Sequence, residues 1–284
     1  MMIHIAGAGC PDPSGDRFGT CIVLDVLGQT LMFDCGPAAT YKLARIGIRP
    51  TQISRLFFTH HHFDHNCDYP CFLLSRWDQG AGKEPRLHVY GPPPTKRFTE
   101  RLIGAKGAFV DDWKARVDHP ASQALHKNRG GTLPRPAPKV DVEDVGPGAI
   151  YEDGDLRVTA ASVHHVEPSL KSLAYRVEST EPTVVLTGDA GRCDALGELA
   201  RGADVLVMCC AYSGDIAPEV ADVVTGATDA ANIAREAGAS TLVLTHTTPG
   251  MGKPGRREAV VGEIARIYEG RIIFADEMLS LAIP

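Results

Sequence analysis

The run Thr59-His60-His61-His62-Phe63-Asp64-His65-Asn66 constrains the fold of this chain more than any other feature. It directly follows Arg55-Leu56-Phe57-Phe58, an apolar run typical of a strand, and contains the pattern H-x-H-x-D-H. Alternate residues at a strand end point the same way, so His60 and His62 can bind one metal ion. Asp64 and His65 follow in the turn and can reach a second ion. The alternative, a solvated histidine-rich loop, is disfavoured because four ligand-type residues at this spacing are typical of a metal site.

Several further segments resemble one known family when they are taken in chain order. The motif and its flanks resemble the branch of the metallo-β-lactamase superfamily that contains ribonuclease Z and its arylsulfatase- and phosphodiesterase-like relatives. The other segments that carry the resemblance are Gly7-Ala8-Gly9-Cys10-Pro11, Phe33-Asp34-Cys35-Gly36, Tyr90-Gly91-Pro92-Pro93 and Leu244-Thr245-His246-Thr247-Thr248-Pro249. The resemblance covers nearly the whole chain and implies a metal-dependent hydrolase. Because the branch contains many activities, it is a poor guide to substrate.

Length and composition predict one hydrolase domain over residues 1–284. The chain is 44% hydrophobic and can bury a sizeable core. No secretory h-region and no apolar run long enough to span a bilayer are found. Eight scattered cysteines form no CxxC pair, which predicts reduced thiols and a cytoplasmic protein. The net charge of −6 disfavours a nucleic-acid partner.

Strands and helices alternate in two halves. Strands are expected at 2–6, 21–26, 30–33, 183–187, 204–208, 241–244 and 271–274, and helices at 37–44, 193–201, 228–237 and 256–268. The resemblance implies that these form an αββα sandwich, with two sheets packed face to face and helices outside. Between the halves, residues 107–148 predict an irregular insertion. It is either a surface excursion or a lid that brings Trp113, His119 or His126 near the substrate.

The resemblance implies two metal groups that share one carboxylate. His60, His62, His165 and Asp189 would hold one ion, and Asp64, His65, Asp189 and His246 the other. Val163-His164-His165-Val166-Glu167-Pro168-Ser169 selects His165, because a metal histidine of the branch stands three residues before a Pro-Ser pair. Asp34 resembles a carboxylate that orients ligand imidazoles. Two Zn²⁺ ions are expected, with Mn²⁺ or Fe²⁺ as alternatives, and they would generate a bridging hydroxide nucleophile.

The chain also departs from ribonuclease Z. Cys209 and Gly226 stand where that enzyme carries the glutamate and histidine that protonate its leaving oxygen, and no basic, glycine-rich tRNA-gripping arm is found. A buried, inert thiol is expected at Cys209. A leaving group that needs no strong general acid, such as a phenolate, fits better than a ribose hydroxyl. Asp64, His164 and Tyr212 are the candidate catalytic residues, the last two as alternative proton donors.

The main hypothesis is therefore a dinuclear metal-dependent hydrolase of a small ester-like substrate, which could be a phosphodiester, a sulfate ester, a carboxylic ester or a lactone. An RNA 3′-processing endonuclease, a hydrolytic dehalogenase and a non-catalytic metal-binding module are the alternatives. A small-molecule substrate, no membrane and no nucleic-acid partner are expected, and a homodimer is left open.

Overall fold

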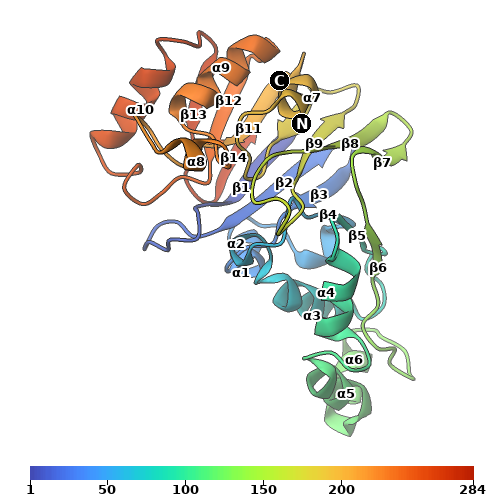
Figure 1. The fold of residues 1–284 in the computed structure, drawn as a ribbon. Helices are drawn as coiled ribbons and strands as arrows, with labels where there is room; N and C mark the ends of the chain where they lie inside the picture. The colour runs from blue at the N-terminus through green and yellow to red at the C-terminus, as the bar shows by residue number, and fades with distance from the viewer.

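A computed structural model describes residues 1–284, which form two seven-stranded sheets packed face to face with helices outside (Figure 1). The first sheet has the order β14-β1-β2-β3-β4-β5-β6 and the second β13-β12-β11-β10-β9-β8-β7. Strands of the first sheet are β1 (Met2–Ala8), β2 (Thr20–Val26), β3 (Gln29–Phe33), β4 (Arg55–Phe57), β5 (His88–Gly91), β6 (Asp141–Asp144) and β14 (Leu279–Ala282). Those of the second are β7 (Gly148–Asp153), β8 (Leu156–Ser162), β9 (Leu173–Glu178), β10 (Val184–Leu186), β11 (Val205–Cys209), β12 (Thr241–Thr245) and β13 (Arg271–Phe274). The expected αββα sandwich is confirmed.

The helices fall into two groups, one for each sheet. The first half carries α1 (Ala39–Arg45), the 3₁₀ turn η1 (Pro50–Gln52), α2 (Phe63–Asn66), α3 (Tyr69–Gly80), α4 (Thr95–Ile103), α5 (Val110–Asp118) and α6 (Pro120–Asn128). The second half carries α7 (Asp194–Ala200), α8 (Pro218–Ala221), α9 (Ala227–Ala237) and α10 (Arg256–Ile264). No helix combines the length and apolar character needed to cross a membrane.

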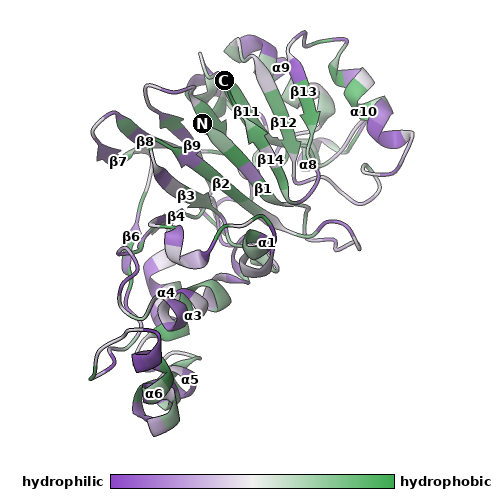
Figure 2. Ribbon diagram, turned by 180° about the vertical axis from the view of Figure 1, so that it is seen from behind, coloured by the Kyte–Doolittle hydropathy of each residue, from purple (hydrophilic) through white to green (hydrophobic).

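Successive side chains along a strand point to opposite faces of its sheet, which explains how each sheet packs against both the other sheet and the helices. In β11, Val205 and Val207 pack in the cluster between the sheets, whereas Leu206 and Met208 pack in the cluster that includes residues of α7, α9 and α10. A strand buried on both faces reads as a continuous apolar run, as in this parallel part of the sheet. Strands β11 and β12 are accordingly coloured as hydrophobic in Figure 2. The expected strands and helices agree with the structure to within a few residues at their ends.

The segment 107–148 differs from the expectation of an irregular insertion. It contains the helices α5 and α6 and the strand β6. The apolar positions Val110, Trp113 and Val117 have helical spacing, and Pro120 starts α6 at a position that needs no backbone donor. His119 caps that helix, since its Nδ1 accepts a hydrogen bond from the backbone N–H of Ala121 at 3.2 Å.

Candidate metal centre

Strand ends from both sheets meet at one edge of the sandwich. The motif residues follow β4, His165 follows β8, Asp189 follows β10 and His246 follows β12. Parallel pairing of β10, β11 and β12 places their carboxyl ends on the same edge. This topology, rather than nearness in sequence, brings the polar side chains together.

Three histidines converge in the first group of ligand-type atoms. His62 Nδ1 lies 2.9 Å from His60 Nε2 and 3.1 Å from His165 Nε2. An oxygen of Asp189 lies 4.0 Å from the first of these Nε2 atoms and 3.9 Å from the second. His62 is partly exposed and the other three residues are buried, so the group opens to solvent on the His62 side.

The second group is buried throughout. His246 Nε2 lies 3.2 Å from Asp64 Oδ2 and 3.0 Å from Asp189 Oδ2. His65 Nε2 lies 3.5 Å from each of these two carboxylate oxygens. Asp189 thus belongs to both groups, as the sequence predicts for a shared ligand.

The donor set fits a pair of divalent transition-metal ions. Asp64 Oδ1, Asp189 Oδ1 and His65 Nε2 are buried and have no hydrogen-bond partner within the protein. Buried polar atoms without partners are costly, and a cation coordinated by them would remove that cost. Nitrogen and carboxylate oxygen ligands of this kind are typical of zinc sites.

The pKa values of His60 in the first group and His65 in the second are shifted in opposite directions. Burial lowers the pKa of His60 well below its usual value, and nearby histidines contribute to the shift, so its ring is neutral. Burial also acts to lower the pKa of His65, but the carboxylates of Asp189 and Asp34 outweigh it and raise that pKa to about 10. Although burial alone would raise the pKa of Asp189, His246 and His65 hold it well below the usual range. The shared carboxylate is therefore ionised and available to a cation.

Neighbouring groups fix the orientation of the imidazoles. Asp34 accepts hydrogen bonds from His65 Nδ1 at 2.7 Å and from the backbone N–H and the hydroxyl of Thr59, both at 2.8 Å. His165 Nδ1 donates to the carbonyl oxygen of Val223 at 2.8 Å. Both rings therefore present Nε2 to the centre. Asp34 is in the position that the sequence predicts. The roles of Thr59 and Val223 were not predicted. The position of Thr59 directly before the motif could have indicated its role, whereas a backbone carbonyl such as that of Val223 leaves no trace in the sequence.

His164 and Tyr212, the two candidate proton donors, lie outside the ligand groups. His164 is exposed, while the adjacent His165, which the motif spacing selects as the ligand, is buried. The hydroxyl of Tyr212 donates to Asp229 Oδ2 at 2.9 Å. Burial and the Asp229 carboxylate raise the pKa of Tyr212, so the phenol keeps its proton.

Tyr212 also explains the glycine at position 226. A Cβ atom on Gly226 would lie 2.3 Å from Cε2 of the Tyr212 ring, so the ring occupies the space into which a side chain would project. Cys209 Sγ lies 3.7 Å from His246 Nδ1 and is buried, and burial raises the pKa of this thiol. The expected inert, buried cysteine is in agreement with this environment.

The structure does not support a lid made by residues 107–148. Figure 1 shows α5 and α6 projecting from the end of α4, away from α2 and the metal motif. His126 is hydrogen-bonded to the carbonyl oxygen of Thr132, and His119 caps α6, so neither histidine contacts the centre. Of the two alternatives, the structure favours a surface excursion over a lid that brings Trp113, His119 or His126 near the substrate, because two helices carry the segment outward.

Comparison with known proteins agrees with this architecture. A family model of the metallo-β-lactamase superfamily matches residues 14–246. A curated ribonuclease Z from Mycobacterium bovis (strain BCG / Pasteur 1173P2) is 28% identical over 286 residues, covering 98% of this chain and 96% of the relative.

Two solved structures share the fold over almost their whole length. The metallo-β-lactamase fold protein YhfI from Bacillus subtilis superimposes with a TM-score of 0.76 at 18% identity, covering 99% of this chain and 98% of its own. The short form of human tRNase Z gives a TM-score of 0.70 at 20% identity and full coverage of both chains.

Proposed function

Because the chain belongs to the metallo-β-lactamase superfamily and is a metal-dependent hydrolase, we propose that it cleaves phosphodiester bonds in RNA near a 3′ end. The observation that carries this proposal is the similarity to a curated ribonuclease Z over 98% of the chain. It favours RNA processing over the small ester-like substrate that the sequence motifs and the net charge suggested.

The residues of the centre support phosphodiester hydrolysis. His60, His62, His165 and Asp189 would hold one divalent cation, and Asp64, His65, Asp189 and His246 a second, with zinc the best match to the ligands. When bound, such ions activate water and polarise a phosphoryl oxygen. Asp34 keeps the ring of His65 in the ligand orientation, and burial of the second group excludes bulk water. Substrate would approach from the partly exposed side of His62.

The leaving oxygen receives little help from the protein. Cys209 is a buried thiol of raised pKa, and Gly226 has no side chain, so neither can donate a proton as a glutamate–histidine pair would. This observation favours a second candidate function, hydrolysis of small aryl phosphodiesters, sulfate esters, carboxylic esters or lactones. We expect any alkyl substrate to react more slowly than an aryl substrate.

A substrate panel tests the two candidates. Metal-loaded protein is assayed on a precursor tRNA, bis(p-nitrophenyl) phosphate, p-nitrophenyl sulfate, p-nitrophenyl acetate and several lactones, with Asp189→Asn as the control that disables both metal groups. We expect a defined 3′ cut in the RNA and turnover of the aryl phosphodiester. Rapid lactone or sulfate hydrolysis with uncut RNA would overturn the proposal and establish the second candidate.

A further inference from the structure

His246 has a backbone conformation that sets it apart from the other ligand-type residues. Its φ is 53°, in the left-handed region, which is unfavourable for a residue that has a Cβ atom. Such a conformation persists only where the surrounding structure holds it. Relaxation to a right-handed or extended backbone would move its Nε2 away from the carboxylate oxygens of Asp64 and Asp189, which lie at 3.2 Å and 3.0 Å. The second metal group therefore depends on whatever fixes the chain at this position.

The ring of His246 is held less firmly by its own contacts than that of His65, the other histidine of the second group. Nδ1 of His65 donates to the Asp34 carboxylate at 2.7 Å. Nδ1 of His246 instead faces Sγ of Cys209 at 3.7 Å, and sulfur is a weak hydrogen-bond acceptor. The position of the His246 ring is therefore set mainly by its backbone.

Thr247, the next residue, is anchored through both its backbone and its side chain. Its N–H donates to the carbonyl oxygen of Ala8 at 3.2 Å. Its hydroxyl accepts a hydrogen bond from Nη1 of Arg17, and the whole residue is buried. Because both anchors restrain Thr247, the peptide that joins it to His246 cannot rotate freely, and the left-handed conformation is retained.

Arg17 reaches Thr247 from the loop between β1 and β2. It is 3% exposed, and its guanidinium lies over the Phe274 ring, 5.5 Å from the ring centroid. Its Nη2 forms an ion pair with Asp276 at 3.0 Å, and the same carboxylate pairs with Arg257 at 2.9 Å. Because the guanidinium is planar and always charged, these contacts make it a rigid donor to the Thr247 hydroxyl.

The burial of Arg17 is more than the ion pair with Asp276 requires. The Asp276 side chain is 56% exposed, and Arg257 pairs with it while remaining 35% exposed. A buried cation is costly, and Nε of Arg17 also has no hydrogen-bond partner. An arginine that served only this carboxylate could stay at the surface, so its burial against Thr247 points to a further role.

We propose that Arg17 is a positioning residue for the second metal group. Through Thr247 it keeps His246 in the left-handed conformation that presents Nε2 to a cation. Arg17 itself is not a ligand, because its guanidinium is directed to Thr247 and Asp276. The inference rests on the metal ligands named under the proposed function, but not on RNA as the substrate.

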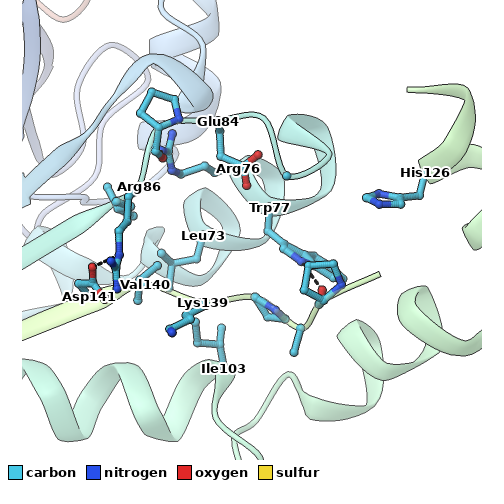
Figure 3. Close-up of a pocket in the computed structure, with 16 residues that line it drawn as sticks. Leu73, Arg76, Trp77, Glu84, Arg86, Ile103, His126, Lys139, Val140 and Asp141 are labelled. Carbon is cyan, nitrogen blue, oxygen red and sulfur yellow. Dashed lines mark hydrogen bonds and ion pairs between the residues drawn. The ribbon is translucent and has the colours of Figure 1, made fainter. Parts of the chain in front are cut away.

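Arg76 of α3 provides a matched control. It is also 3% exposed, and its guanidinium donates to the carbonyl oxygens of Pro50 at 2.8 Å and of Pro85. Figure 3 shows Arg76 beside Glu84 at the edge of a hollow that none of the ligand-type residues lines. Loss of either buried arginine should lower stability, but only loss of Arg17 should disturb metal binding.

The test compares Arg17→Met, Thr247→Val and the double variant with the wild type and with Arg76→Met. Thr247→Val removes the acceptor hydroxyl with little change of shape, so it decides the question alone if Arg17→Met does not fold. Zinc affinity is measured by chelator competition, and cadmium NMR of the cadmium-loaded protein gives one resonance for each bound ion. Thermal unfolding of the chelator-treated protein reports stability separately.

We expect Arg17→Met and Thr247→Val each to weaken one of the two ions by about 10- to 100-fold, as for other groups that orient a metal ligand. The cadmium resonance of that ion should shift or vanish while the other is unchanged. The double variant should bind no more weakly than the more severe single variant, because both changes remove the same hydrogen bond. Arg76→Met should unfold at a lower temperature and bind both ions like the wild type.

Wild-type affinity for both ions in Arg17→Met or in Thr247→Val overturns the inference. Additive losses in the double variant, or an equal loss of metal in Arg76→Met, also overturn it, since the effect would then not pass through the Thr247 hydroxyl. If the wild type binds two ions that depend on Arg17 but leaves RNA uncut, the proposed function fails and the role of Arg17 stands. If RNA is cut and Arg17→Met binds metal normally, the function stands and the role of Arg17 fails.

Discussion

Replacing Asp34 with asparagine should weaken one metal group without removing any ligand. The carboxylate lies at the end of β3, is 1% exposed, and accepts three hydrogen bonds from Thr59 and His65. Its backbone has a φ of 60°, a left-handed conformation that asparagine also tolerates, so the exchange leaves the local fold intact. Only the charge and the number of acceptor sites change.

The asparagine amide would reverse one of these hydrogen bonds. If its oxygen still accepts from the Thr59 backbone, its NH₂ group faces His65 Nδ1, which must then accept. The imidazole proton moves to Nε2, the atom that faces Asp64 and Asp189. A protonated Nε2 cannot bind a metal ion, so affinity at the second group should fall by about 10- to 100-fold, or about 1.4 to 2.7 kcal/mol.

Metal affinity is measured by titration against a chelator of known zinc affinity, with metal content per chain as the readout. We expect one ion to be lost at a lower chelator concentration than in the wild type, while the ion at His60, His62 and His165 is retained. Asp68→Asn is the matched control, because Asp68 accepts a backbone hydrogen bond from Thr40 at 2.6 Å and is outside both ligand groups. Unchanged affinity in the Asp34 variant, or equal weakening of both ions, would refute the tautomer argument.

Three further outcomes are expected. His165→Ala should lose metal, whereas His164→Ala should retain it and change turnover at most; metal analysis of both variants checks this, and the opposite pattern would contradict the choice of His165 as the ligand. In chelator-treated protein, His65 has a pKa of about 10 when folded and about 6.5 when unfolded, so its contribution to stability is complete below pH 6.5 and is lost as the pH rises toward 10. Thermal unfolding across that range should show this loss, and a rise in stability would count against it. Tyr212→Phe should reduce hydrolysis of bis(p-nitrophenyl) phosphate less than threefold, because the hydroxyl is engaged with Asp229; a hundredfold loss would identify Tyr212 as the proton donor.

The sequence predicted the ligand positions because they depend on strand ends. Polar residues directly follow apolar runs at β4 of the first sheet and at β10 and β12 of the second, and these strand ends meet at one edge of the sandwich, whatever the exact strand boundaries are. The choice of His165 over His164 followed from a motif spacing and agrees with the burial of one ring and the exposure of the other. Their roles in metal binding remain predictions.

Other features depend on contacts that have no sequence pattern. The acceptor for His165 is the carbonyl oxygen of Val223, and any residue could supply it. The sequence shows that glycine stands at position 226 where ribonuclease Z carries a histidine. It does not show that the ring of Tyr212 fills the space into which a side chain at that position would project. Helices α5 and α6 were missed because the charged residues within 111–118 and the prolines within 120–138 obscured two short helical repeats.

The net charge was a weak basis for the expectation that nucleic acid is not a partner, because net charge averages over the whole molecule. Residues 95–140 hold 10 Lys and Arg residues and 4 Asp and Glu residues, a local charge of +6. Electrostatic interactions between exposed groups decay over about 8 Å at physiological ionic strength, so an anion at this segment responds to its local charge more than to the distant acidic body. The segment extends at least the length of α4, about 13 Å, from the metal motif, which is more than one such decay length. A chain that is acidic overall can therefore present a cationic surface over one segment, so its net charge alone is a poor guide to the charge of its partners.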